Sequence, residues 1–353
     1  MYYICLRYNT YFYMQPALKV NDHSTIHFGR AAELLPRLLG GKPLVAVTDS
    51  EVKRCHAPLF ADSLTLTVGR GEESKTLETV AALYRALMEC GTDRTSFITG
   101  IGGGIVTDIA GFAAATYMRG IGFGFVPTTL LAQVDASVGG KNGVNVDGYK
   151  NMVGTFAQPQ FVICDVTLLR TLPDREFRAG LAEALKAGII ADPELFGLLE
   201  RNGFDTLRRD ETLLEEVVYR ALRVKADIVA RDEREAGDRR LLNLGHTLAH
   251  AIEKCCPSQL NHGEAVAVGT MMVARAAVRM GVLAGTECRR IEAALTGLGF
   301  SLDVPADISV LLSAVARDKK SSGEAVWLVL PEAIGRCSSR LTPRKELPQL
   351  FAN

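Results

Sequence analysis

The sequence has no excess of charge of either sign, because 40 lysine and arginine residues balance 40 aspartate and glutamate residues among 353. A protein that bound nucleic acid through a general positive field would carry a clear basic surplus, so this class is not expected. A local basic cluster is still compatible with neutrality, and it would indicate a small anionic ligand.

Long apolar runs are also missing. The best stretches, residues 111–118 and 120–126, are broken by Arg119 and Pro127 and fall short of the about 18 residues that cross a membrane. Residues 1–13 lack a basic region followed by an apolar core, so we expect an N-terminal extension rather than a signal peptide. The eight cysteines show neither a CxxC pair nor a zinc spacing, which favours free thiols in the cytoplasm.

The first half of the chain alternates apolar strand-like runs with helical patterns. Residues 43–48, 64–68 and 96–101 are predicted as buried strands, and 76–90 as an amphipathic helix between the last two. Strands joined by helices of this length form right-handed crossovers in a parallel, Rossmann-like sheet.

The second half changes character after Pro173. Long helical patterns dominate, capping signals stand at Asp192 and Asp210, and residues 325–330 form one strand-like run. We therefore predict two domains, an α/β domain over residues 14–173 and a mainly α-helical domain over residues 174–353.

A triple glycine, Gly102 to Gly104, follows a predicted strand and opens the helical run 105–115. Glycines there let the backbone approach a pyrophosphate at the helix N-terminus, although a tight strand-to-helix turn explains them equally well. The pattern departs from GxGxxG. Asp49, at the end of an earlier strand, suits a ribose hydroxyl, but a helix cap is the favoured interpretation.

Metal-ligand residues gather in the second half. His246 and His250 stand four residues apart, on one face of a helix, His262 follows sixteen residues after His246, and Glu183 lies in an earlier helical run with Lys186 one turn later. Two histidines and a carboxylate with an open position form a catalytic zinc set, whereas each residue alone could equally be a core or capping residue. A fourth ligand would close the site, so we interpret His250 as a proton-handling neighbour.

Basic and amide side chains stand beside apolar or glycine-rich segments in both halves. Each alone is more typical of a solvated surface. Lys141 and Lys150 are stronger candidates, because they flank a glycine-rich stretch, residues 139–148, where no regular structure is predicted to need them. Together the basic and amide residues predict a pocket for a substrate with carboxylate and phosphate groups. The group comprises Lys141, Lys150, Asn151, Lys186, Lys225, Arg239, Asn243, Lys319 and Lys320.

These residues lie within motifs that strongly resemble those of the 3-dehydroquinate synthases, a family of the sugar-phosphate cyclases. The resemblance extends from about residue 19 to residue 336 and covers both predicted domains. Its motifs are GGGIVTDIAGF (102–112), PTTLLAQVDASVGGK (127–141), KNMVG (150–154), GLAEALK (180–186), LNLGHT (242–247), HGEAV (262–266) and RDKK (317–320).

The resemblance implies an enzyme that converts 3-deoxy-arabino-heptulosonate 7-phosphate into 3-dehydroquinate and phosphate, in the shikimate pathway. Transient oxidation with bound NAD, loss of phosphate, re-reduction and an intramolecular aldol closure would follow one another without net redox change. A divalent metal, zinc or cobalt, would act as a Lewis acid. NAD would bind to the first domain, and the metal and substrate to the second.

The resemblance also implies roles for individual residues. The metal ligands would be Glu183, His246 and His262. Cofactor contacts would come from Asp49, Gly71, Glu72, Lys75, Gly103, Gly104, Asp108, Thr128, Thr129, Lys141, Lys150, Leu168 and Thr171. Substrate-binding or catalytic residues would be Asp135, Lys141, Asn151, Lys186, Lys225, Arg239, Asn243, His250 and Lys319. Arg119 matches an arginine that reaches the phosphate from a partner subunit, which implies a homodimer.

The sequence departs from the family pattern at Thr107, Val146, Tyr149 and Asn261, and none of these changes removes a ligand or a charge. We expect them to alter affinity rather than activity. Three rival functions stay open: another sugar-phosphate cyclase such as an inosose or valiolone synthase, a polyol dehydrogenase, and a non-catalytic NAD-binding regulator. Asp108 and the stretch 134–141 favour the dehydroquinate branch, and the regulator would not need the metal set.

Overall fold

The computed structural model describes residues 15–257, 259–316 and 324–352. Residues 1–13, for which an extension is predicted, and Lys319 lie outside the described residues. The chain divides into two compact units, Met1–Pro173 and Asp174–Asn353. Within the described ranges, no helix is both long and apolar enough to cross a membrane.

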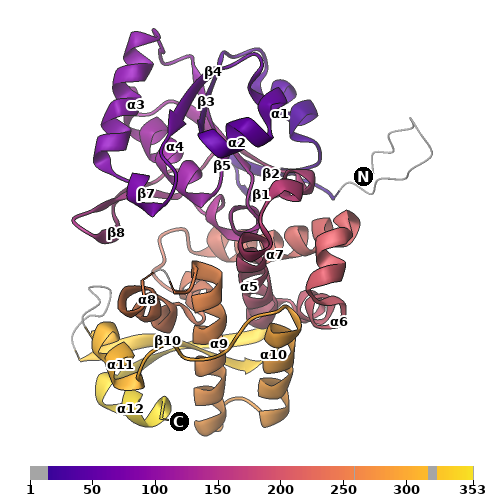
Figure 1. Ribbon diagram of the computed structural model, residues 1–353, viewed down its shortest axis with the longest axis vertical. Coiled ribbons are helices and arrows are strands. Elements are labelled where there is room, and N and C mark those ends of the chain that lie inside the picture. Colours follow the sequence, from indigo (N-terminus) through magenta and orange to yellow (C-terminus); the bar gives the residue numbers. More distant parts are fainter. Residues whose placement is uncertain (1–14, 258, 317–323, 353) are drawn as a thin grey trace. The chain divides into compact units, whose positions relative to one another are not determined.

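Unit 1 is built on a seven-stranded sheet with the order β1-β2-β9-β6-β5-β3-β4. Figure 1 shows helices α1 to α4 around this sheet. All pairs are parallel except β1 with β2 at one edge. The inner strand β5 is buried along its whole length, and the ring of its first residue, Phe97, stacks on that of Phe161 in β9 with centroids 5.3 Å apart. The parallel Rossmann-like sheet is therefore confirmed. The strands are β1 (Leu18–Asn21), β2 (Ser24–Phe28), β3 (Leu44–Asp49), β4 (Leu64–Val68), β5 (Phe97–Gly102), β6 (Gly122–Pro127) and β9 (Phe161–Cys164).

The two helices predicted in unit 1 form where they were expected. The helix predicted over residues 76–90 is α3, and the helical run after the triple glycine is α4. α4 is buried on most of its surface, and small and apolar residues occupy most of its positions. The helices are α1 (Ala31–Leu39), α2 (Ser50–Cys55), α3 (Leu77–Glu89) and α4 (Gly104–Thr116).

One prediction in this unit is wrong. Residues 139–148 do not form an irregular loop, because β7 (Lys141–Val146) pairs antiparallel with β8 (Tyr149–Phe156). Val146 pairs with Tyr149, and the two turn residues Asp147 and Gly148 have φ of 50° and 76°. Positive φ at both positions is the geometry of a two-residue type I′ hairpin, for which Asp-Gly is a strong signal.

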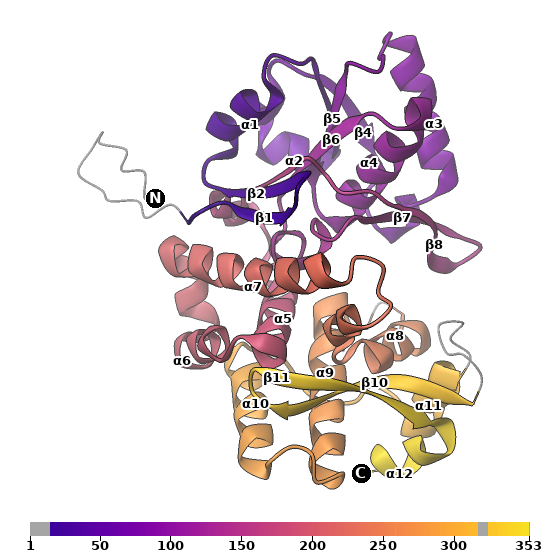
Figure 2. The same cartoon turned by 180° about the vertical axis from the view of Figure 1, so that it is seen from behind.

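Unit 2 is mainly helical, as predicted, and carries one antiparallel ribbon (Figure 2). The predicted caps are confirmed, because the Asp192 and Asp210 side chains accept backbone N–H groups at the starts of α6 and α7. The helices are α5 (Asp174–Ala191), α6 (Pro193–Arg209), α7 (Glu211–Arg231), α8 (His246–Cys255), α9 (His262–Arg279), α10 (Gly285–Gly297), α11 (Ile308–Ala316) and α12 (Leu347–Leu350). The predicted strand at 325–330 is β10 (Ala325–Ala333), and its partner is β11 (Arg336–Pro343).

Candidate metal centre and cofactor region

Three helices of unit 2 bring one candidate metal ligand each to a common point. Glu183 lies in the middle of α5, His246 is the first residue of α8, and His262 is the first residue of α9. One ligand atom of each residue lies within 4.8 Å of the others. The residues that the sequence singled out as a metal set are therefore neighbours in space.

Glycines allow the helices to approach so closely. A Cβ on Gly263 would lie 2.3 Å from the Cα of Ala179, so α9 rests directly on the backbone of α5 next to His262. A Cβ on Gly269 would lie 2.3 Å from the carbonyl oxygen of Gly245, so α9 also touches the residue that precedes His246. Backbone contacts on both sides of α9 thus position the two histidines against Glu183.

The geometry fits a tetrahedral metal ion. The Oε1 atom of Glu183 lies 3.5 Å from Nε2 of His246 and 3.4 Å from Nε2 of His262. Ligands held at about 2.1 Å from a tetrahedral zinc ion lie about 3.4 Å apart. Both carboxylate oxygens of Glu183 are buried without a hydrogen-bond partner of good geometry among the described residues, although the Lys186 ammonium lies against one of them. Buried acceptors left in this state are suited to a cation.

Electrostatics prepare two of these groups for ligation and leave a proton on the third. Burial would raise the pKa of the Glu183 carboxyl, but the Lys186 ammonium and the imidazoles hold it well below its ordinary value. Burial and the Lys186 charge lower the pKa of His246 to about 3, so that ring is neutral. Burial would also lower the pKa of His262, but Glu183 and Glu253 raise it to about 10. A metal ion at this site would therefore displace one proton from His262.

His250 lies beside the ligand group and not within it. The ring centroids of His246 and His250 are 5.6 Å apart, one turn along the same face of α8. Its predicted role as a proton-handling neighbour stays a prediction.

Asn261, a departure from the family pattern, caps α9: its side chain accepts the backbone N–H of Glu264 at 2.9 Å, and the Glu264 carboxylate accepts that of Asn261 at 2.8 Å. This capping box positions the turn that carries His262.

Cations that are more typical of a surface when judged alone are buried in unit 2. Lys186 is paired with Glu183, Lys225 lies on α7 with 7% exposure, and Arg239 lies in the 3-10 turn η6 (Asp238–Asn243) with 3% exposure. The elements α5, α7 and η6 pack against one another. The solvated-surface interpretation is therefore wrong for these three residues.

The loop before η6 is ordered by a single carboxylate. Asp232 accepts backbone N–H groups from Ala236, Gly237 and Arg239 at 2.7–3.0 Å. Within this loop Glu235, with φ 63°, accepts a hydrogen bond from Nδ2 of Asn243. The sequence analysis missed Glu235, because a single glutamate in a charged stretch carries no spacing signal.

The predicted cofactor residues of unit 1 lie after the carboxyl ends of parallel strands. This edge is where ligands bind in open parallel sheets, because the strand-to-helix loops lie there. Asp49 ends β3, Gly71, Glu72 and Lys75 follow β4, Gly103 and Gly104 follow β5, Thr128 and Thr129 follow β6, and Leu168 and Thr171 follow β9.

The structure shows the local geometry at two of these positions. Asp49 is the cap of α2, because its Oδ1 accepts the N–H groups of Glu51 and Val52 at 2.8 and 2.9 Å. Gly103 is the N-cap residue of α4 and has no side chain that could cap the helix. The N–H of Thr128 donates to the carbonyl of Gly102 at 2.9 Å. The turn between β5 and α4 is thus tight, and the N-terminus of α4 lies at the carboxyl edge of the sheet.

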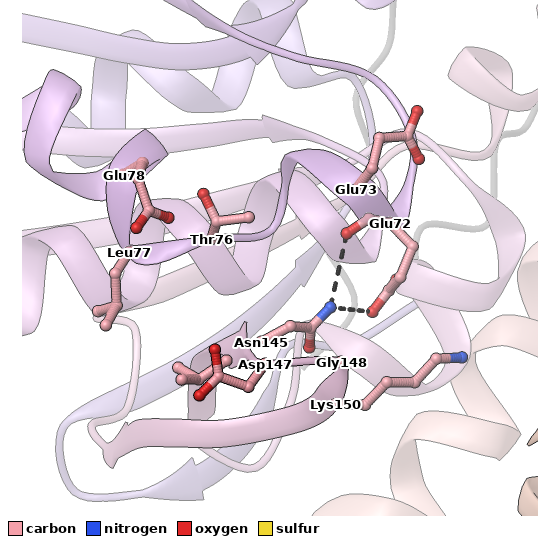
Figure 3. A pocket seen from close by; sticks show the side chains of 10 residues that line it. Glu72, Glu73, Thr76, Leu77, Glu78, Asn145, Asp147, Gly148 and Lys150 are labelled. Carbon is pink, nitrogen blue, oxygen red and sulfur yellow. Dashed lines mark hydrogen bonds between the residues drawn. The ribbon is translucent and has the colours of Figure 1, made fainter.

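A polar network joins the β7–β8 hairpin to this region. The buried Lys75 ammonium contacts Asp108 of α4 and donates to Oδ1 of Asn151 at 2.6 Å. Nδ2 of Asn145 donates to Oε1 of Glu72 at 2.8 Å, and the side chains of Asn145, Glu72 and Lys150 line a pocket (Figure 3). Glu72, Lys75, Asp108, Lys150 and Asn151, which were predicted individually, therefore lie together.

Three further predicted residues of unit 1 have other surroundings. Asp135 lies in the π-helical turn Ala132–Ala136, and Lys141 is the exposed first residue of β7. Arg119 is exposed in the 3-10 turn η3 (Tyr117–Arg119), where Met118 and Arg119 have φ of 50° and 66°. Left-handed conformations are costly for such residues and are common at functional sites.

Two family models match the chain. The 3-dehydroquinate synthase N-terminal model matches residues 65–179, and the 3-dehydroquinate synthase C-terminal model matches residues 180–321. The chain belongs to the 3-dehydroquinate synthase family. The resemblance inferred from the motifs is thereby confirmed.

Curated relatives agree with this assignment. The chain is 43% identical over 307 residues to a 3-dehydroquinate synthase of Desulforamulus reducens, covering 84% of this chain and 86% of the relative. It is 47% identical over 289 residues to one of Halorhodospira halophila, covering 79% and 82%.

Solved structures show the same fold. The 2-epi-5-epi-valiolone synthase of Streptomyces hygroscopicus, with NAD+ and Zn2+ bound, is 27% identical with a TM-score of 0.85 and covers 95% of this chain and 97% of that one. A 2-deoxy-scyllo-inosose synthase complexed with carbaglucose-6-phosphate, NAD+ and Co2+ is 24% identical with a TM-score of 0.85 and covers 95% and 99%.

Proposed function

We propose that this chain is a 3-dehydroquinate synthase that converts 3-deoxy-arabino-heptulosonate 7-phosphate into 3-dehydroquinate and phosphate. The observation that carries the proposal is the open ligand set of Glu183, His246 and His262 in a chain that matches both family models. Unit 1 would bind NAD at the carboxyl edge of its sheet, and unit 2 would hold the metal and the substrate. The cytoplasm is the proposed location.

When bound, NAD and a zinc or cobalt ion would supply a reversible hydride acceptor and a Lewis acid. The chain itself would orient the reacting groups. Glu183, His246 and His262 would hold the ion, and a set of three protein ligands is the kind that lets a metal also bind substrate hydroxyls. Lys225 and Arg239 are buried cations that suit the carboxylate and phosphate of the substrate, since fixed charges in a desolvated site stabilise a leaving anion without reorganising.

The same logic supports the roles proposed for the remaining residues. Lys141 and Asn151 lie on the two strands of the β7–β8 hairpin, and Lys75 and Asp108 are joined to Asn151 by the polar network. Lys186 lies against Glu183, and Asn243 is positioned by Glu235. His250, on the ligand face of α8, is proposed to move protons, and Asp135 to contact the substrate.

A coupled assay of phosphate and NADH tests the proposal. Phosphate should be released from the heptulosonate phosphate only with NAD present, while absorbance of NADH stays flat because the hydride returns to the same molecule. Accumulation of NADH in step with phosphate would contradict the proposal and indicate a dehydrogenase. Release of phosphate from other sugar phosphates alone would indicate another cyclase of this fold.

Metal content tests the ligand set separately. His246→Ala should lose bound metal and activity while it keeps its far-ultraviolet circular dichroism. His23→Ala, a change of an exposed histidine in unit 1, should leave both unchanged. Full metal content in purified His246→Ala would show that the ligands are wrongly assigned.

We also propose that the protein is a homodimer in which Arg119 completes the phosphate site of the partner. The support is the exposed arginine on a turn with two consecutive left-handed residues, anchored by the Tyr117 hydroxyl, which donates to the Thr92 carbonyl at 3.0 Å. Mixing inactive Arg119→Ala with inactive His246→Ala should restore about a quarter of the wild-type activity, because half of the dimers would hold one intact site. Failure of complementation in a mixture where differently tagged subunits are shown by co-purification to have formed mixed dimers would contradict this arrangement.

A further inference from the structure

Glu253, which the family motifs do not bring into the site, lies on the ligand face of α8. It follows His246 by seven residues, two helical turns, and its side chain is 15% exposed. Its Oε1 lies 3.6 Å from Nδ1 of His262, in ion-pair contact slightly beyond hydrogen-bond length. One helix thus carries a ligand, His246, together with a carboxylate that faces a ligand from another helix.

The two candidate histidine ligands direct their ring nitrogens in the same way. Each turns Nε2 toward Glu183, at 3.5 Å for His246 and 3.4 Å for His262. Each turns Nδ1 toward an oxygen acceptor, which is the carbonyl of Leu244 at 3.1 Å for His246 and the carboxylate of Glu253 for His262. A histidine that binds a metal through Nε2 must carry its proton on Nδ1, and an acceptor at Nδ1 favours that tautomer and fixes the ring.

We propose that Glu253 is a positioning residue of the metal centre, which holds the His262 ring with its proton on Nδ1 and its Nε2 lone pair directed at the metal. The proposal rests on the metal site of the proposed function. His262 has particular need of such a partner, because its side chain is 34% exposed whereas that of His246 is 12% exposed and held by main chain. The ammonium of Lys186 beside Glu183 repels a divalent cation at this site. A second carboxylate adds negative charge, which offsets that repulsion.

The affinity for zinc, measured on the metal-free protein by competition with a chromophoric chelator, tests the proposal. Glu253→Gln removes the charge but keeps an acceptor, and Glu253→Ala removes both. Loss of such a partner commonly weakens metal binding by about 10- to 100-fold, so we expect Glu253→Ala to fall in this range and Glu253→Gln to weaken binding less. Glu287→Gln on α10 is the matched control, because it removes one carboxylate charge from the same unit outside this site and should bind zinc as the wild type does.

A spectroscopic measurement separates positioning from a general structural effect. The visible absorption of the cobalt-substituted protein should change in both Glu253 variants and not in Glu287→Gln. The melting temperatures of the metal-free Glu253 variants should stay close to that of the metal-free wild type. Zinc affinity within twofold of the wild type in Glu253→Ala would overturn the proposal. So would a loss of affinity that is matched by a lower melting temperature with an unchanged cobalt spectrum. The proposed function is tested separately by the phosphate and NADH assay on the wild-type protein, which can fail without any change in the zinc affinities of the Glu253 variants.

Discussion

Substitution of Gly263 by alanine should damage the metal centre without touching any ligand. A Cβ at this position would lie 2.3 Å from Cα, 2.4 Å from the carbonyl oxygen and 2.7 Å from the carbonyl carbon of Ala179. All three are backbone atoms of α5, so no side-chain rotation relieves the overlap. Helix α9 would have to retreat from α5 by about 1 Å to restore ordinary carbon contacts of about 3.5 Å.

The size of that displacement determines the expected effects. His262 is the preceding residue and moves with α9, whereas metal–ligand distances tolerate changes of only about 0.2 Å. Zinc affinity should therefore fall at least about tenfold, as it does when ligands lose their positioning. Overpacking of this kind costs about 1–3 kcal/mol, which lowers the melting temperature of a unit of this size by about 2–12 °C.

Gly297→Ala provides the control for this prediction. Gly297 ends α10, and a Cβ there would have nothing within 4 Å. Alanine should stabilise this helix by up to about 1 kcal/mol and leave zinc affinity unchanged. The assays are thermal denaturation of the metal-free proteins and chelator competition. Wild-type zinc affinity and melting temperature in Gly263→Ala would refute the close contact between α9 and α5.

Three further predictions concern the surroundings of this centre. Arg239→Ala should lower kcat/KM by at least about tenfold with metal retained, because removing a buried charged contact costs about 2–4 kcal/mol in the transition state, while exposed Arg275→Ala should match the wild type in steady-state assays. Asn261→Ala should destabilise the protein by about 1 kcal/mol through loss of its helix cap, measured by urea denaturation. Burial would raise the pKa of the Asp232 carboxyl, but hydrogen bonds from the N–H groups of its loop lower it, so its stabilising effect is complete above about pH 4 and is lost as the pH falls through the folded value. Asp232→Asn should therefore be less stable at pH 7 and lose less stability between about pH 5 and pH 3, and an unchanged acid dependence would contradict this account.

The strands and helices that frame the sites could be predicted from the sequence because their signals are local. The apolar runs at β3, β4 and β5 predict buried strands from their own residues. Asp192 and Asp210 are predicted as helix caps from the residues that follow them. The Asp147–Gly148 turn carried an equally local signal, which was overlooked because the surrounding glycines were interpreted as a loop.

The candidate metal ligands could also be predicted from the sequence, since two histidines and a carboxylate are the residue types of a catalytic zinc set. Their meeting at one point depended on contacts between residues distant in the chain. Helices α5, α8 and α9 come together through the close contacts of Gly263 with Ala179 and of Gly269 with Gly245. No periodicity in the sequence indicates which glycine faces which backbone segment.

Tertiary structure alone decided which polar residues outside the candidate ligand set are buried or face it. Glu253 is one glutamate among many in the sequence, and only the packing of α8 beside α9 turns it toward Nδ1 of His262. Lys225 and Arg239 looked like ordinary surface residues because burial of a charge is set by neighbouring elements and not by the residues next to it in the chain. The sequence by itself determined the chemistry of the ligands, whereas their distances, protonation and orientation were decided by helices whose close contacts have no local signature.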